Sequence, residues 1–243
     1  MKCEDAVQRQ KDGRDLVGAD RNSKSEIDAF LSETEKRPVI ATGRGRLIFA
    51  LDATMSRQPT WDLAQHLQAH MFETAAAHGG LDVQLVFYRG FNECKASRFL
   101  NGGKALAAAM TRITVAAGHT QIGKVLRHVL EEAGNAPVRA LVFIGDAMEE
   151  RADDLADLAG RLGLMGVKAF VFQEGADRVA ERAFRQIALL TGGAYATFDA
   201  GAAQRLAALL SAAAAYAAGG RQALELEAAD KGAAAMLLLS QMS

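Results

Sequence analysis

The 243-residue sequence has few cysteines, no excess of charge of either sign and no long apolar run. Its two cysteines, Cys3 and Cys94, do not form the pattern of a disulfide scaffold or of a thiolate zinc site. A reducing, cytoplasmic setting is the simplest expectation for such a chain.

The charges nearly cancel, because 28 basic side chains stand against 29 acidic ones and the formal net charge is -1. No global field therefore draws the protein toward phosphate backbones or anionic membranes. The balance argues against nucleic acid or membrane as the primary partner.

Targeting and membrane segments are also missing from the sequence pattern. The first residues include acids and lack the apolar run of a secretory signal. The longest apolar stretch, at 207–218, is dominated by alanine and is too short to span a bilayer. We expect a protein that is neither exported nor embedded in a membrane.

The remaining composition, 50% hydrophobic, is sufficient for the core of one large domain. Residues 1–24 are charged and aperiodic, which predicts a flexible arm. Residues 25–45 read as a short helix and a linker, and residues 46–218 as the main domain. The tail at 219–243 is expected to dock its leucines on the domain, with a partner-binding peptide as the alternative.

Strands and helices alternate along the main domain. Apolar runs predict strands at 47–51, 81–88, 93–99, 140–145, 167–172 and 195–198. Helical periodicity predicts helices at 61–77, 106–113, 122–130, 155–164, 180–190 and 203–216. This order predicts an α/β fold: a doubly wound, mainly parallel, Rossmann-like sheet with helices on both faces and one antiparallel edge strand.

Oxygen-bearing side chains follow the apolar strands. Asp52 and Asp146 each come directly after a strand, where doubly wound sheets bind ligands. In an extended segment the alternating run Asp52-x-Thr54-x-Ser56 points its side chains into one hollow, and Thr120 adds a hydroxyl from another loop. Such an oxygen-only set suits Mg²⁺ or Mn²⁺, and zinc fits it poorly.

This constellation resembles the von Willebrand factor A (VWA) domain and its metal-ion-dependent adhesion site (MIDAS), over residues 46–216. The resemblance is to a bacterial, single-domain, cytosolic member, and it implies a divalent-metal-dependent protein-protein interaction module without a catalytic step. The bound ion would accept an Asp or Glu carboxylate from a partner protein. The metal ligands implied are Asp52, Thr54, Ser56, Thr120 and Asp146.

The sequence departs from the common VWA pattern at three places. Thr54 stands where serine is more frequent, and His119 precedes Thr120 where a small residue is usual. The first change keeps the hydroxyl oxygen, whereas the second places an imidazole at the rim of the site, where it can crowd the ion or contact a partner. The third is Gly145-Asp146-Ala147, which differs from the frequent Asp-Gly pairing and implies a tighter loop.

Three alternatives remain at this stage. Asp52 resembles the nucleophile of a haloacid dehalogenase (HAD)-like, magnesium-dependent phosphatase, but Thr54 occupies the position of the general acid and base and cannot exchange protons near neutral pH. That alternative assigns a phosphate contact to Thr120, charge neutralisation to Lys124, and magnesium to Asp146 with Glu149 or Glu150. A metal-free, degenerate VWA scaffold is the second alternative, and simple helix capping by each residue is the third.

Two further features have plain structural interpretations. His66 and His70 share a helical face at metal-ligand spacing, but no acidic third ligand accompanies them, so an exposed helix face is expected. The turn containing Arg89, Phe91 and Asn92 is interpreted as a polar turn around one buried aromatic side chain.

Overall fold

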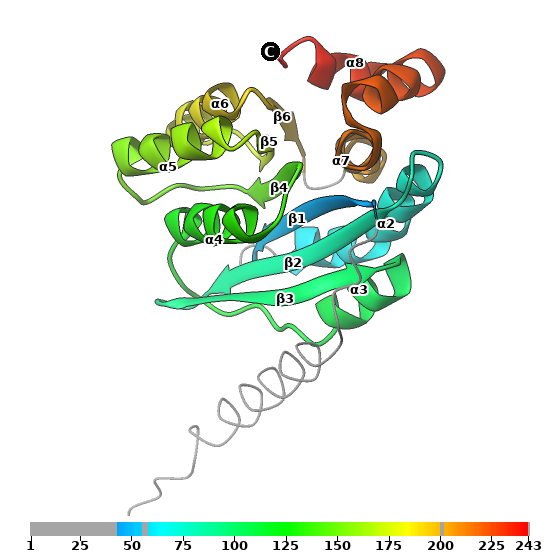
Figure 1. Ribbon diagram of the computed structural model, residues 1–243. Helices are drawn as coiled ribbons and strands as arrows, with labels where there is room; N and C mark the ends of the chain where they lie inside the picture. The colour runs from blue at the N-terminus through cyan, green and yellow to red at the C-terminus, as the bar shows by residue number, and fades with distance from the viewer. Residues whose placement is uncertain (1–42, 55–57, 200–201, 243) are drawn as a thin grey trace, which may run out of the picture.

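A computed structural model of the protein describes residues 43–54, 58–199 and 202–242. These residues form a central sheet with helices on both of its faces (Figure 1). The predicted arm at 1–24 and nearly all of the predicted helix and linker at 25–45 lie outside the described residues.

The sheet has six strands in the order β3-β2-β1-β4-β5-β6. The strands are β1 Gly45–Asp52, β2 Leu81–Arg89, β3 Glu93–Asn101, β4 Ala140–Gly145, β5 Lys168–Glu174 and β6 Ala194–Phe198. All neighbouring pairs are parallel except β2 and β3, which pair antiparallel at one edge. The predicted fold class is therefore confirmed.

The central strand β1 is buried on both faces because helices cover the sheet from both sides. Leu47, Phe49 and Leu51 belong to one hydrophobic core, and Ile48 and Ala50 belong to the other. Successive side chains of a strand point to opposite faces, so a strand covered twice needs apolar residues at every position. The continuous apolar run in the sequence has this physical origin.

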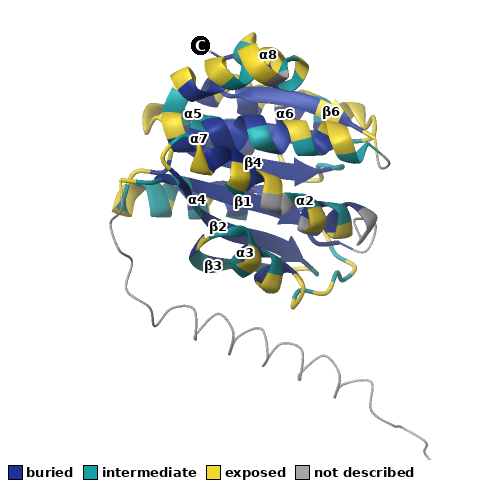
Figure 2. Ribbon diagram, turned by 90° about the vertical axis from the view of Figure 1, so that its right-hand side faces the viewer, coloured by how far each residue is buried: buried dark blue, intermediate teal, exposed yellow. Residues whose placement is uncertain are grey.

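The helices divide between the two faces. They are α2 Gln58–Ala76, α3 Gly103–Met110, α4 Ile122–Asn135, α5 Ala152–Leu164, α6 Arg178–Thr191, α7 Ala203–Lys231 and α8 Ala233–Leu239. Helices α2, α3 and α7 pack in one core and α4, α5 and α6 in the other, and Figure 2 shows the buried strands between exposed outer helix surfaces. None of the described helices combines the length and the hydropathy needed to cross a bilayer.

The C-terminal region is more regular than the sequence pattern indicates. A helix is predicted only at 203–216, whereas α7 continues to Lys231 across a kink at Gly220, and α8 follows. Gly220 has φ 72° and ψ -160°, a non-helical conformation that glycine adopts at little cost, so α7 consists of two helical segments that meet at this residue. Leu224 and Leu238 are fully buried in the core shared with α2 and α7.

Gln241, just after α8, covers the open edge of the sheet at β6. Its Oε1 accepts the Tyr195 N–H at 3.0 Å, and its Nε2 donates to the Tyr195 carbonyl at 2.9 Å. The side-chain amide thus satisfies the backbone groups that an edge strand otherwise exposes.

The burial of Leu238 predicts that α8 contributes to global stability. The substitution Leu238→Ala should lower the free energy of unfolding by about 2–5 kcal/mol, because it removes a buried side chain and leaves a cavity. Leu237→Ala changes the adjacent, exposed leucine and should cost less than about 1 kcal/mol. Denaturant unfolding of both variants checks this, and equal midpoints would show that α8 is not part of the cooperative core.

Candidate metal centre

Asp52 and Asp146 lie at the carboxyl ends of neighbouring strands. Asp52 is the last residue of β1 and is buried, and Asp146 directly follows β4. The register pairs Leu51 with Ile144, so the two ends lie at the same edge of the sheet. The direction of winding reverses between β1 and β4, which is where open α/β sheets bind ligands.

Tyr88 connects the two aspartates electrostatically. It pairs with Asp52 in the sheet register, is completely buried, and its hydroxyl has no hydrogen bond of standard geometry within the described part of the chain. Burial raises the pKa of the Tyr88 phenol well above its ordinary value, and the negative charges of Asp52, Glu150 and Asp146 raise it further. The charges of three carboxylates at this edge therefore all disfavour ionisation of this phenol.

The segment after β1 is held by backbone contacts. The Thr54 N–H donates to Asp52 Oδ1 at 2.8 Å, which orients the carboxylate toward its own loop. The Ala53 N–H donates to the Tyr88 carbonyl at 2.9 Å, and the Ala53 carbonyl accepts the Ala116 N–H at 3.0 Å. The loop that carries Thr120 is thus attached to the loop that carries Thr54. The remaining predicted ligand, Ser56, lies outside the described residues.

Thr120 and Glu149 form two reciprocal hydrogen bonds, in which the backbone N–H of each residue donates to the side chain of the other. The Thr120 N–H donates to Glu149 Oε2 at 3.0 Å, and the Glu149 N–H donates to Thr120 Oγ1 at 3.0 Å. His119 Nδ1 lies 3.1 Å from the same carboxylate oxygen. Because Glu149 follows Asp146 by three residues, this pair ties the Thr120 loop to the loop after β4. The Thr120 N–H lowers the pKa of Glu149 below its ordinary value, with a smaller contribution from His119.

Glu150 completes the link between these loops by capping α4. Its carboxylate oxygens accept the Ile122 N–H at 2.5 Å and the Gly123 N–H at 2.8 Å. Gln121, the residue before the helix, makes no capping bond with its own side chain. A carboxylate at a helix N-terminus satisfies free N–H groups and is favoured by the helix dipole. From the sequence, Glu149 and Glu150 are expected only as magnesium ligands of the phosphatase alternative.

A close backbone approach fixes the Thr120 loop from the other side. A Cβ atom on Gly118 would lie 2.1 Å from the Gly90 carbonyl oxygen, so only glycine fits there. The His119 N–H donates to the same carbonyl at 3.1 Å. The absence of a side chain at residue 118 is the sequence signal for this contact.

The expectation of a buried aromatic in the turn after β2 is wrong. Phe91 is 79% exposed, and its ring lies 5.2 Å from the His119 ring in an edge-to-face arrangement. Arg89 is the buried residue of this turn, because its guanidinium binds the Glu93 carboxylate at 2.9 Å and the Thr114 hydroxyl at 2.9 Å. The ion pair and hydrogen bonds outweigh the cost of burying the cation.

The donor chemistry of this edge suits a hard cation. Within the described residues no group of three or more His, Cys, Asp or Glu side chains is arranged to hold a metal. The predicted set has only two acids, so hydroxyl oxygens must supply the other protein ligands. Carboxylate and hydroxyl oxygens are donors that Mg²⁺ and Mn²⁺ accept, with water completing the shell.

Comparison with known proteins identifies the fold. No protein-family model matches the chain, and no curated protein sequence matches it. Among solved structures, the SpRpn10 VWA domain superposes with a TM-score of 0.52 at 13% identity, covering 65% of this chain and 90% of that one. Proximal thread matrix protein 1 from the mussel byssus, with a zinc-occupied MIDAS motif, gives 0.53 at 14% identity, covering 72% and 46%.

At these identities the likeness establishes the fold, which is that of a VWA domain. The chain corresponds to nearly the whole SpRpn10 domain but to less than half of the mussel protein. The predicted Rossmann-like VWA architecture is confirmed.

The contact between Glu149 and Thr120 predicts a pH-dependent signal. A depressed carboxyl pKa means that the contact stabilises the loop above the ordinary glutamate range and is lost as the pH falls through the depressed value. The Thr120 amide proton should therefore shift in NMR spectra with a midpoint below that of an ordinary glutamate. Glu149→Gln should abolish this titration, and Glu131→Gln, a change at an exposed acid of α4, should leave it intact. An unchanged Thr120 titration in Glu149→Gln would contradict the assignment.

Proposed function

We propose that the protein is a non-enzymatic VWA interaction module that binds a divalent cation and, through it, an acidic side chain of a partner protein. The observation that carries this proposal is that β1 and β4, which end at Asp52 and just before Asp146, are parallel neighbours whose carboxyl ends lie together at the switch point of the sheet. The contacts of Thr54 with Asp52, and of Thr120 with Glu149, add two hydroxyl-bearing residues to the same edge. A solved VWA neighbour holds zinc in its MIDAS motif, which supports a divalent ion here.

Asp52, Thr54, Ser56, Thr120 and Asp146 are the proposed protein ligands of Mg²⁺ or Mn²⁺. When bound, the ion supplies an electrophilic centre for a partner's Asp or Glu. Only two of the proposed ligands carry charge, so the ion keeps much of its attraction for a further carboxylate. A pilus adhesin is among the structural neighbours, and a cytoplasmic module that captures one partner protein is our proposal for this chain.

Metal binding is tested with Mn²⁺, whose unpaired electrons broaden nearby NMR signals. Broadening should centre on Asp52, Thr120 and Asp146, and Thr120→Val or Asp146→Asn should weaken Mn²⁺ and Mg²⁺ binding at least about tenfold. Thr111→Val changes an exposed hydroxyl at the end of α3 and should bind the ions normally. No binding by the unmodified chain would instead favour a metal-free VWA scaffold.

The partner chemistry is tested on a peptide array that contrasts Asp and Glu with Asn and Gln. Capture should require both the carboxylate and Mn²⁺, and a chelator should remove it. Capture that persists in chelator, or that is equal for Asn and Gln peptides, would contradict the proposed role of the ion.

The HAD-like phosphatase is the second candidate. The contacts of Lys124, Glu149 and Glu150, which that activity would require, argue against it. The Lys124 ammonium is bound to the Asn92 carbonyl at 3.1 Å and to Gln121 Oε1 at 2.8 Å. Glu149 and Glu150 accept backbone N–H groups at the start of α4. These residues thus serve the loop structure, and Thr54 offers no general acid.

We therefore expect no magnesium-dependent hydrolysis of p-nitrophenyl phosphate above the uncatalysed rate, because Thr54 occupies the position of the general acid and base and cannot exchange protons near neutral pH. The assay should compare the unmodified chain with Asp52→Asn at equal concentrations. Turnover that is lost in Asp52→Asn would support the phosphatase and overturn the interaction module.

A further inference from the structure

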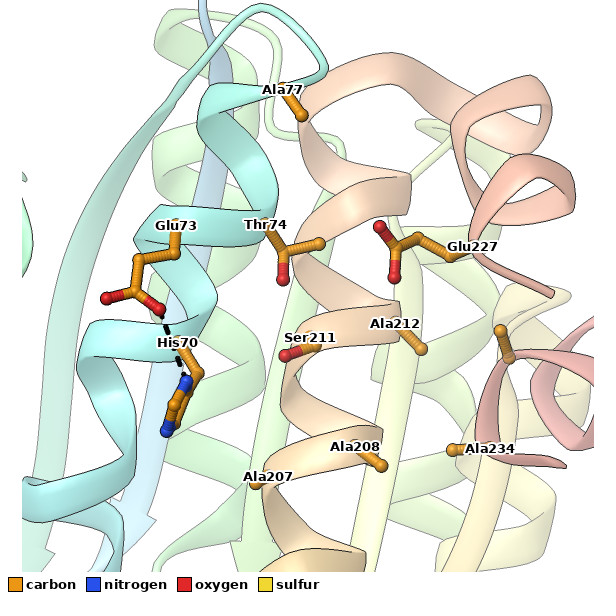
Figure 3. A pocket seen from close by; sticks show the side chains of 11 residues that line it. His70, Glu73, Thr74, Ala77, Ala207, Ala208, Ser211, Ala212, Glu227 and Ala234 are labelled. Carbon is orange, nitrogen blue, oxygen red and sulfur yellow. Dashed lines mark ion pairs between the residues drawn. The ribbon is translucent and has the colours of Figure 1, made fainter. Parts of the chain in front are cut away.

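A cavity of about 370 Å³ lies between α2, α7 and α8 (Figure 3). It is separate from the candidate metal centre. Helix α2 begins at the carboxyl edge of the sheet, where Thr60 donates to Glu174 at the end of β5. Its last turns, which line the cavity, lie next to the start of β2 at the opposite edge. The volume falls in the range of small-molecule sites.

The walls of the cavity are mainly alanine side chains. Helix α7 contributes Ala207, Ala208 and Ala212, and helix α8 contributes Ala234 and Ala235. Small methyl groups leave space for a ligand and give it an apolar surface, but they do not select its chemistry. Selection must come from the polar groups among them.

Thr74 and Ser211 present hydroxyls to this space. Thr74 is only 8% exposed, and both Thr74 and Ser211 line the cavity. In Figure 3 both hydroxyls lie between α2 and α7. A ligand that donates a hydrogen bond to these hydroxyl oxygens gains affinity.

Glu227 brings a negative charge to the cavity from the second half of α7. Its side chain is 11% exposed, and its described contact is with His78 Nε2 at 3.4 Å. Figure 3 shows its carboxylate pointing to the side of α7 on which Thr74 lies. No lysine or arginine is among the residues that line the cavity. The exposed pair of His70 and Glu73, 3.3 Å apart, stands at the rim and balances itself when the histidine is protonated.

We infer that this cavity binds a primary ammonium group attached to a short apolar chain. An ammonium has three N–H donors, and the cavity offers a carboxylate and two hydroxyl oxygens as acceptors. The alanine walls then contact the methylene groups of the ligand. Such a group is found in a free alkylamine and in the lysine side chain of another protein, and the test below distinguishes these sources.

The experiment follows amide signals of the full-length ¹⁵N-labelled chain by NMR during addition of n-butylammonium chloride, at ionic strength held constant with sodium chloride. Shifts should centre on Thr74, Ser211 and Glu227. 1-Butanol, which has the same chain without the charge, should bind at least about tenfold more weakly, because it loses the charged hydrogen bond. Equal binding of 1-butanol would overturn the inference by showing an apolar cavity only.

Variants separate the ammonium site from a general effect of charge. Glu227→Gln keeps the shape but removes the charge and should weaken n-butylammonium binding about tenfold or more. Thr74→Val should weaken n-butylammonium binding by a smaller factor. This variant provides the test if Glu227→Gln does not fold. Glu225→Gln, which alters an exposed acid of α7 paired with Arg221, is the matched control and should bind normally. Unchanged affinity in both Glu227→Gln and Thr74→Val would overturn the inference.

A peptide with one central lysine, compared with its acetylated form, identifies the source. Binding of the lysine peptide that is at least as tight as that of n-butylammonium supports a protein side chain as the occupant. Binding of the free amine without the peptide supports a small molecule. Absence of binding by both probes would overturn the ammonium site.

Discussion

The parallel pairing of β1 with both β2 and β4 is the constraint on which the candidate metal centre depends. The register sets Asp52 beside Tyr88 and Leu51 beside Ile144, so two aspartates from distant parts of the sequence emerge at one edge. A shift of one residue would turn every side chain of β1 to the other face. Because both faces are packed against helices, the two cores hold this register and, with it, the position of Asp52.

Carboxylates fix the loops above that edge by accepting backbone N–H groups. Glu149 holds Thr120, and Glu150 holds the first turn of α4. Glu149 and Glu150 therefore hold the loops in place. From the sequence alone, the same two acids could equally have bound a metal or a substrate. The charges of Glu149 and Glu150 are thereby partly neutralised by backbone dipoles. Because these two acids hold the loops, the proposed set of metal ligands contains only two charged residues, Asp52 and Asp146.

The fold could be predicted from the sequence because its signals are local. The apolar run 47–51 and the amphipathic pattern of 180–190 each reflect burial of the element that contains them. The position of Asp52 and Asp146 followed from the rule for strand ends. The mutual bonds of Thr120 and Glu149 could not be predicted, since they depend on how two loops meet. The helical segment after Gly220 could not be predicted either, because it follows a break in the helix and depends on the packing of Leu224 in the folded chain.

The two proposed sites would bind ligands of opposite charge, one at the carboxyl ends of the strands and the other between the helices α2, α7 and α8. A bound divalent ion would attract a carboxylate, whereas Glu227 in the alanine-lined cavity would attract an ammonium. With a formal net charge of -1, the whole molecule exerts little long-range preference for either ligand. Selection must therefore arise from the few charges placed at each site. A substitution on the outer surface that changes the net charge should leave both preferences unchanged, whereas the loss of one carboxylate, at Asp146 or at Glu227, should remove one preference and spare the other.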